Sequence, residues 1–339
     1  MELKRVGLDL AKNVFQVHGV DGQEVVRCRR PLRRSELLKF FADRPPCLIG
    51  MEACAGAHYW ARELTKLGHT VKLMAPQLVK PYIKSQKNDA NDAEGICEAV
   101  GRPNMRFVPV KTVAQQEVQS AHRIRSELIR QRTAKANQIR GLLAEFGVVV
   151  ERRIEVLRRA LPKLLEAEAG NGLSEPTRRL LEGLRGDLVQ LDERVGALDT
   201  EIKRVAKEDA ACVRLQTIPG IGPLTASALV SAVGEGRQFK NGRQLAAWAG
   251  LVPGQDSSGG KPRLLGISKH GDTYLRTLLI HGGRAVERTC GTKTDARSRW
   301  LHDLGERRHR NIAAVAQANR NARIAWALLT RGESFRLPA

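Results

Sequence analysis

The start of the fold is decided by residues 4–20, KRVGLDLAKNVFQVHGV. Their β-branched and aromatic residues predict a strand, a tight turn and a second strand. The dipeptide Asp21-Gly22 is typical of a hairpin turn, so a third strand is expected over residues 24–27. One acidic residue, Asp9, lies inside the first apolar run. The chain therefore opens with three antiparallel strands, the first of which carries a carboxylate.

The next eighty residues predict alternating helices and strands. The pattern indicates a helix at 35–41, a buried strand at 47–51, a helix at 57–67, a strand at 71–74 and a helix from Pro76. Three antiparallel strands followed by β-α-β-α is the order expected of an α/β ribonuclease-H-like domain, which we place at residues 1–106.

Four acids stand at the ends of these elements: Asp9, Glu52 after the second apolar strand, and Asp89 and Asp92 in the helical stretch NDANDAE. Asp89 and Asp92 are three residues apart, so a helix projects them from one face. Carboxylate oxygens suit hard divalent cations, and a pair of Mg²⁺ ions about 3.5–4 Å apart assists phosphodiester chemistry. We therefore predict a catalytic Mg²⁺ or Mn²⁺ site on these four acids. Alternatively, Asp9 is a structural buried acid and Asp89 a helix N-cap.

Composition favours a partner that carries negative charge. The 339 residues have a formal net charge of +21, which is typical of nucleic-acid-binding proteins. Ribosome-associated and membrane-surface proteins are the alternatives. Aromatic residues make up 4%, which argues against stacking on single-stranded bases as the main binding mode, and Trp248, Trp300 and Trp326 are expected in the core.

The cysteines and the hydropathy pattern point to an intracellular protein. Six scattered cysteines form no CxxC pair, which argues against a zinc site or a disulfide framework. No apolar run approaches the roughly 18 residues that a membrane span needs. We expect a cytoplasmic, nucleoid-associated bacterial protein with no membrane partner.

The middle of the chain, residues 107–208, predicts long helices. Apolar residues repeat there with the 4-3 spacing of a coiled coil, at Leu184, Leu188, Leu191, Val195, Leu198, Ile202 and Val205. Breaks near Gly147 and residues 170–172 would let two helices fold back antiparallel. Such a hairpin, or spoke, can separate two catalytic domains or join subunits. The alternative is an internal helical pair with a solvated basic face.

The remaining residues, 209–339, predict a mostly α-helical domain that begins with a helix-hairpin-helix-like turn, IPGIGP at 218–223. Glycines there permit positive φ angles, and the backbone amides of Gly220 and Gly222 could approach a phosphate. The alternative is a glycine-rich turn between helices that binds nothing.

A second constellation is GLVPGQDSSGGKPRLLGISKHGD, at 250–272, followed by Leu275-Arg276. Serine hydroxyls lie there among basic residues that could bind nucleic-acid phosphates and stabilise a phosphoryl-transfer transition state, namely Lys261, Arg263, Lys269 and Arg276. A flexible loop with no ligand is the alternative.

These motifs together resemble a known family. GLDLAKNVFQVH, IGMEACAGAHYW, KNDANDAEGI and IPGIGPLTASALVSAVGEGRQF are similar to the DEDD transposases of insertion-sequence family one-hundred-ten, and SSGGK…GISKHGD to its branch eleven-eleven. The resemblance implies a RuvC-like N-terminal domain whose acidic tetrad falls on Asp9, Glu52, Asp89 and Asp92. The family motif K-T-D-x-x-D-A reads here from Lys87 with Asn88 in place of Thr, which spares both acids.

The resemblance also implies a catalytic serine in a C-terminal transposase domain. The S-x-G-K pattern places it on Ser258, with the adjacent Ser257 as the fallback. It implies partners as well: double-stranded donor and target DNA, a structured guide RNA (bridge RNA) encoded by the element, and further copies of the chain in a dimer or tetramer. The expected function is that of an insertion-sequence transposase, a site-specific DNA recombinase.

Two other functions fit the same residues. One is a Mg²⁺-dependent hydrolytic junction nuclease of RuvC type, in which water attacks and Ser258 only holds phosphate. The other is a non-catalytic nucleic-acid-binding scaffold, which predicts that changing the four acids to alanine leaves activity intact.

Overall fold

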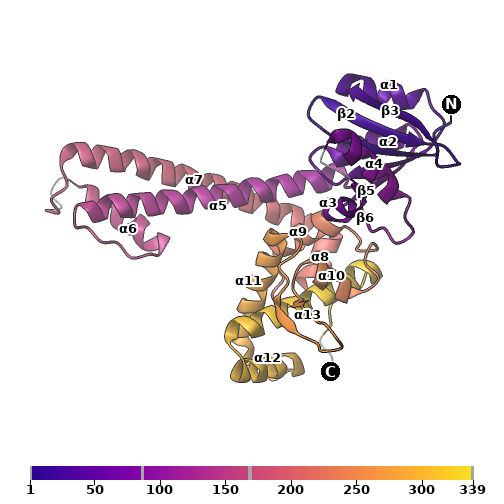
Figure 1. Cartoon of the computed structure of the whole chain (residues 1–339). Coiled ribbons are helices and arrows are strands. Elements are labelled where there is room, and N and C mark those ends of the chain that lie inside the picture. Colours follow the sequence, from indigo (N-terminus) through magenta and orange to yellow (C-terminus); the bar gives the residue numbers. More distant parts are fainter. Residues whose placement is uncertain (1, 85–87, 167–169, 337–339) are drawn as a thin grey trace. The chain divides into compact units, whose positions relative to one another are not determined.

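A computed structural model describes residues 2–84, 88–166 and 170–336, and the chain forms two compact units (Figure 1). The first comprises Met1–Val113 with Gly236–Lys240, and the second Ala114–Glu235 with Asn241–Ala339. Lys87 of the predicted acidic motif lies outside the described residues. The predicted domain boundaries at residues 106 and 208 remain predictions.

The first unit is built on a mixed sheet of six strands in the order β3-β2-β1-β4-β5-β6. β1, β2 and β3 are antiparallel neighbours, β1, β4 and β5 run parallel, and β6 returns antiparallel to β5. The strands are β1 (Arg5–Asp9), β2 (Val14–Val20), β3 (Val26–Arg33), β4 (Leu48–Glu52), β5 (Thr70–Met74) and β6 (Phe107–Val108). β6 was not predicted, because two residues are too few to show a periodicity.

Helices cover both faces of this sheet (Figure 1). They are α1 (Leu37–Ala42), α2 (Ala57–Lys66), α3 (Pro76–Val79) and α4 (Asp89–Val100), with 3₁₀ turns η1 (Arg34–Glu36) and η2 (Lys80–Tyr82). Side chains alternate along a strand, so Val6 and Leu8 of β1 join the core formed with α1 and α2. Gly7 of β1 and Gly50 of β4 face the other way and contact α4.

The second unit begins with two long helices, α5 (Val113–Glu145) and α7 (Glu175–Glu208), joined through α6 (Ile154–Leu165). Ion pairs join the two long helices at Arg125–Asp199, Arg132–Asp192 and Lys135–Asp187. Along these pairs, the residue numbers rise in α5 and fall in α7, so the two helices are antiparallel. The predicted apolar seam of α7 is buried or half-buried along its length. The predicted coiled-coil winding of α5 and α7 around each other remains a prediction.

As far as residue 336, the rest of the second unit consists of helices and one short β-hairpin with their connecting loops. It comprises α8 (Ala210–Gln216), α9 (Pro223–Val233), α10 (Gly242–Trp248), β7 (Pro253–Gln255), β8 (Leu264–Ile267), α11 (Thr273–Cys290), α12 (Ala296–Arg307) and α13 (Arg310–Arg331). α11 packs closely on α13, because Gly283 lies against the carbonyl of Ala314 with no room for a Cβ atom. Over the described ranges, no helix has the length and apolar character to cross a bilayer.

Candidate active site

Three of the four predicted acids lie together. Asp9 is the last residue of β1, and Asp89 and Asp92 lie in the first turn of α4. Each offers a carboxylate oxygen, and these oxygens all lie within 4.8 Å of one another. Asp9 and Asp92 are half-buried and Asp89 is exposed. Asp9 thus lies close to Asp89 and Asp92, although about eighty residues separate them in the sequence, because the end of β1 lies beside the start of α4.

The first turn of α4 is set by a side-chain cap. Asn88 has extended backbone angles, and its side-chain oxygen accepts a hydrogen bond of 2.8 Å from the amide of Asn91. Asn88 is therefore the N-cap, a role that asparagine fills well. Asp89, the alternative N-cap in the sequence, is instead the first helical residue, so its carboxylate is not used for capping.

The closeness of α4 to β1 depends on Gly7. A Cβ atom at this position would lie 2.0 Å from the carbonyl oxygen of Ala93 and 2.4 Å from the amide nitrogen of Cys97. Only glycine allows the helix axis to approach the strand this closely. Gly7 therefore places the first turn of α4 beside Asp9.

The fourth acid, Glu52, lies on the neighbouring strand. The last registered pair of β1 and β4 is Leu8 with Met51, so Asp9 and Glu52 follow at the carboxyl ends of parallel strands. By strand alternation, both side chains share the face of Gly7 and Gly50, which is the face that α4 covers. Among the described residues, the group of carboxylates within 4.8 Å does not include Glu52.

The thiol of Cys54 provides a second indication that the acids are close. Burial raises the pKa of this thiol, and the negative charges of Glu52 and Asp9 raise it further. Both carboxylates are therefore within electrostatic reach of one sulfur atom.

The residues present fit a hard divalent cation. Oδ1 of Asp92 is buried and has no hydrogen-bond partner among the described residues. A buried carboxylate oxygen without a donor is costly unless a cation or water satisfies it. Asp9, Asp89 and Asp92 are thus the residues that could hold a metal ion, with Glu52 at the neighbouring strand end.

The predicted serine loop is a short β-hairpin rather than a flexible loop. β7 and β8 pair antiparallel, and the chain turns through Ser257, Ser258 and two glycines with positive φ, Gly259 and Gly260. The backbone carbonyl of Ser258 accepts a hydrogen bond of 3.0 Å from the amide of Lys261. Sequence reasoning did not anticipate the strands, because their residues include glycine and proline.

The two serines differ in what their hydroxyls contact. Oγ of Ser257 accepts hydrogen bonds from the backbone amide of Arg263 at 3.0 Å and from the side chain of Gln255 at 2.9 Å. The hydroxyl of Ser258, which is exposed, makes no hydrogen bond within the described part of the chain. Ser257 thus stabilises the hairpin, and Ser258 presents an uncommitted hydroxyl at its tip.

The predicted basic ligands separate into two groups. Lys261, Arg263 and Lys269 are exposed on or beside the hairpin, and Arg263 lies 3.8 Å from the carboxylate of Asp256. Arg276 is buried, and its guanidinium donates to the carbonyl of His270 at 2.8 Å. The burial of Arg276 argues against its predicted phosphate contact and gives it a structural role instead.

The turn at 218–223 is packed on its inner side. Gly220 has φ of +88°, and a Cβ atom there would lie 2.6 Å from the carbonyl oxygen of Gly282 in α11. The carbonyl of Pro219 accepts from Asn321 at 3.1 Å and from Arg297 at 3.3 Å. Gly220 is therefore required by helix packing, whereas Gly222 has open space around it. Phosphate binding at Gly220 and Gly222 remains a prediction.

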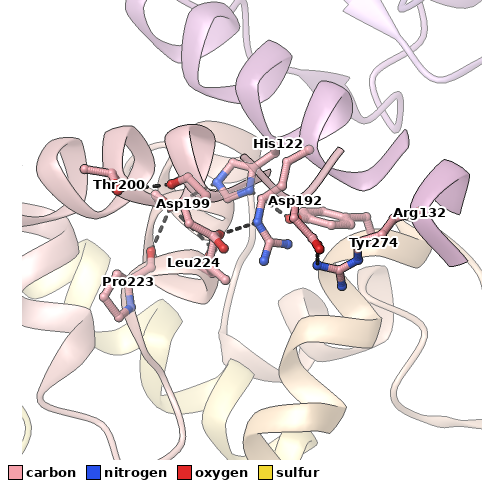
Figure 2. A network of polar contacts seen from close by, with 11 residues as sticks. His122, Arg132, Asp192, Asp199, Thr200, Pro223, Leu224 and Tyr274 are labelled. Atoms are coloured by element: carbon pink, nitrogen blue, oxygen red, sulfur yellow. Dashed lines mark hydrogen bonds and ion pairs between the residues drawn. The ribbon is translucent and has the colours of Figure 1, made fainter. Parts of the chain in front are cut away.

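A buried polar network was missed by sequence reasoning (Figure 2). The ring of His122 in α5 lies 2.9 Å from the hydroxyl of Tyr274 and 2.9 Å from that of Ser227. Burial, together with a smaller effect of the positive charge of Arg125, lowers the pKa of His122 to about 4. Arg125 in turn pairs with Asp199 of α7. The network fixes the start of α11, which follows the serine hairpin, against α5 and α9.

Comparisons with known proteins place the sequence among transposases. Residues 6–147 match a family model of DEDD transposases, and residues 212–299 match the transposase IS116/IS110/IS902 family. The chain is 56% identical to a probable family 20 transposase of Pseudomonas aeruginosa, over 99% of both chains. It is 47% identical to the transposase for insertion sequence element IS1111A of Coxiella burnetii, over 100% of this chain and 93% of that one. A third relative, the transposase for insertion sequence element IS1328 of Yersinia enterocolitica, is 41% identical over 97% of this chain and 98% of its own length.

An α/β unit with clustered acids, followed by a helical remainder, thus belongs to an enzyme that acts on DNA. The chain belongs to the IS110/IS116 family of DEDD transposases. Transposases catalyse DNA cleavage and strand transfer, so DNA is the substrate. Enzymes with a DEDD set of acids typically use divalent metal ions.

Proposed function

We propose that this transposase is a site-specific recombinase in which Ser258 is the nucleophile and Asp9, Glu52, Asp89 and Asp92 hold Mg²⁺ or Mn²⁺. The observation that carries the proposal is the contrast between the two serine hydroxyls. Ser257 is engaged by Arg263 and Gln255, whereas Ser258 is exposed at a hairpin tip and uncommitted. The ribonuclease-H-like (RuvC-like) character of the first unit belongs to the same proposal.

The chemistry proceeds through a covalent intermediate. Oγ of Ser258 gives its proton to water and attacks the scissile phosphorus, and a serine–phosphate bond forms. The bond to the leaving 3′ oxygen breaks, and this oxygen takes up a proton from water. A free 3′ hydroxyl results, and after strand exchange such a hydroxyl attacks the serine phosphoester and releases the serine. A divalent cation bound by the acids supplies charge neutralisation at the phosphate. Energy is conserved in the phosphoester, so no external source is required.

The exposed basic residues around the hairpin support phosphate binding in this scheme. Lys261, Arg263 and Lys269 carry positive charge close to Ser258 in sequence, and such charge stabilises a phosphoryl-transfer transition state. It also favours the serine alkoxide over the neutral hydroxyl.

We further propose that an element-encoded guide RNA directs the enzyme and that it acts as a homo-oligomer, a dimer or a tetramer. The net charge of +21 and the family membership support this. The proposal predicts that recombination of donor and target DNA requires the RNA. Equal recombination by RNA-free protein would contradict it.

The mechanism is tested by looking for a protein–DNA adduct that resists SDS. Wild type, Ser258→Ala, Ser257→Ala and Asp9→Ala are incubated with end-labelled donor and target DNA, Mg²⁺ and the element's RNA. We expect an adduct in wild type and in Ser257→Ala, and none in Ser258→Ala. Ser257→Ala is the matched control because it removes the neighbouring hydroxyl and leaves Ser258 in place.

Three outcomes would reject parts of the proposal. Cleavage without an adduct, lost in Asp9→Ala but kept in Ser258→Ala, would indicate a hydrolytic junction nuclease. An adduct that is lost only in Ser257→Ala would show that Ser257, and not Ser258, is the nucleophile. Normal recombination by Asp9→Ala would leave a non-catalytic scaffold as the better description.

A further inference from the structure

A groove of about 1700 Å³ lies wholly within the second unit. One wall is the face of α13 that carries Arg320, Arg323 and Arg331, and Arg243 of α10 also lines the groove. Helix geometry spaces the row from Arg320 to Arg331 over about 16 Å. The groove is therefore long enough to follow an extended ligand.

The groove is strongly basic. Among the described residues, its lining includes one acid, Glu333, and five arginines, Arg243, Arg320, Arg323, Arg331 and Arg336. Arg323 and Arg331 are exposed, and neither forms an ion pair with a described residue. Arginines that are not neutralised by the protein's own acids are available to phosphate oxygens.

Aromatic rings line the same groove, although aromatic residues are scarce in the chain. Trp300, Trp326 and Phe335 are all half-buried, so part of each ring is accessible. The guanidinium of Arg320 lies 5.0 Å from the ring centre of Trp300. Phe335 is fixed by a hydrogen bond of 2.9 Å from its backbone amide to the hydroxyl of Thr217. The expectation that Trp300 and Trp326 are simply core residues was thus incomplete.

We propose that this groove binds an unpaired DNA strand. A positive groove with aromatic platforms is how proteins hold single-stranded nucleic acid, whereas paired bases inside a duplex cannot stack on such rings. The groove is also lined by Pro253 and Ile267, which belong to the two strands of the serine hairpin. The strand held in the groove is then the DNA next to the scissile phosphate, an inference that rests on the proposed role of Ser258.

Two kinds of variant separate the phosphate contacts from the stacking contacts. Arg323→Gln with Arg331→Gln removes two exposed charges, and Trp326→Leu removes a ring while keeping apolar volume. The matched control is Arg152→Gln with Arg179→Gln, which removes two exposed charges elsewhere in the second unit. Circular dichroism melting curves check that all variants remain folded.

Binding is measured by fluorescence anisotropy with a labelled 12-nucleotide oligo(dT), an RNA oligo(U) of equal length and a 12-base-pair duplex, in EDTA. The arginine variant should bind oligo(dT) about tenfold more weakly. The slope of log K against log salt should become less steep by about 1.4, because two phosphate contacts are lost and each contributes about 0.7. Trp326→Leu should weaken binding about tenfold with the slope unchanged. The control pair should bind oligo(dT) as wild type does.

The assay contains no metal and measures no cleavage, so its result does not depend on the serine mechanism. The groove variants therefore test the groove even if the adduct experiment fails. A larger loss of oligo(U) or duplex binding than of oligo(dT) binding in the groove variants would overturn the proposal. So would unchanged binding in both groove variants, or an equal loss in the control.

Discussion

Single residues decide whether the proposed metal ligands meet. Asp9 comes from a strand and Asp92 from a helix, and the contact between these elements contains a residue without a side chain, Gly7. The sequence predicted the acids, because each lies at the end of a recognisable element. It did not predict the role of Gly7, which depends on the backbone of a helix more than eighty residues away.

Replacing Gly7 by alanine should separate these elements. A Cβ atom 2.0 Å from the carbonyl of Ala93 forces α4 away from β1, and such overpacking typically costs about 1–3 kcal/mol. We expect a lower free energy of unfolding in urea. We also expect a smaller rise in melting temperature on adding Mn²⁺, because a metal ion that binds the folded state more weakly stabilises it less. Gly22→Ala, with no atom within 4 Å, is the control. A Mn²⁺-induced shift equal to that of wild type would contradict the prediction.

His122 predicts how stability depends on pH. Its folded pKa is about 4 against an ordinary 6.5, mainly because of burial, so below pH 6.5 the unfolded chain binds a proton that the folded chain does not. Its stabilising contribution is therefore complete above pH 6.5 and is lost as pH falls towards 4. The loss amounts to roughly 3 kcal/mol, since one pKa unit is about 1.36 kcal/mol.

The measurement is the free energy of unfolding in urea at pH values from 7 to 4, for wild type and His122→Gln. Other groups titrate in both proteins, so the difference between the two curves isolates His122. We expect the difference to shrink as pH falls. Parallel curves would mean that the imidazole is protonated in the folded protein.

Among the elements, the two long helices differ from the packed helices around the serine hairpin. Three glycines of α7, Gly183, Gly186 and Gly196, have open space where a Cβ atom would lie, with no other atom within 4 Å. Gly282 of α11, by contrast, lies against the backbone of Gly220. Glycine thus lies on an open surface in α7 and in a close helix contact in α11. No pattern in the sequence distinguishes these two settings.

Alanine at Gly183, Gly186 and Gly196 should stabilise the chain. Each exchange removes the backbone entropy cost of glycine in a helix, about 0.5–1 kcal/mol, without meeting another atom. The triple variant should therefore raise the urea midpoint, and Gly282→Ala, whose Cβ would lie 1.9 Å from the carbonyl of Gly220, should lower it. A lower midpoint for the α7 variant would show that this face is covered in solution.

For the whole molecule, the sequence predicted more of the architecture than of the binding surfaces. Strand alternation and apolar periodicity correctly predicted the sheet-containing first part and the helical remainder, because these patterns are local. The groove could not be predicted, since its lining comes from α10, α12, α13 and the hairpin strands, and only the tertiary fold brings them together. Its arginines appeared in the sequence only as part of a general positive charge.

The assignment of the acids and of Ser258 to different compact units has a genetic consequence. Two classes of inactive allele should exist, one damaged at the carboxylates and one at the serine hairpin. If active sites form between copies of the chain, a cell that carries one allele of each class regains mobility of the element by complementation, whereas two alleles of one class stay inert. An insertion sequence whose own transposase gene has decayed in one half would then still move with the help of a relative decayed in the other.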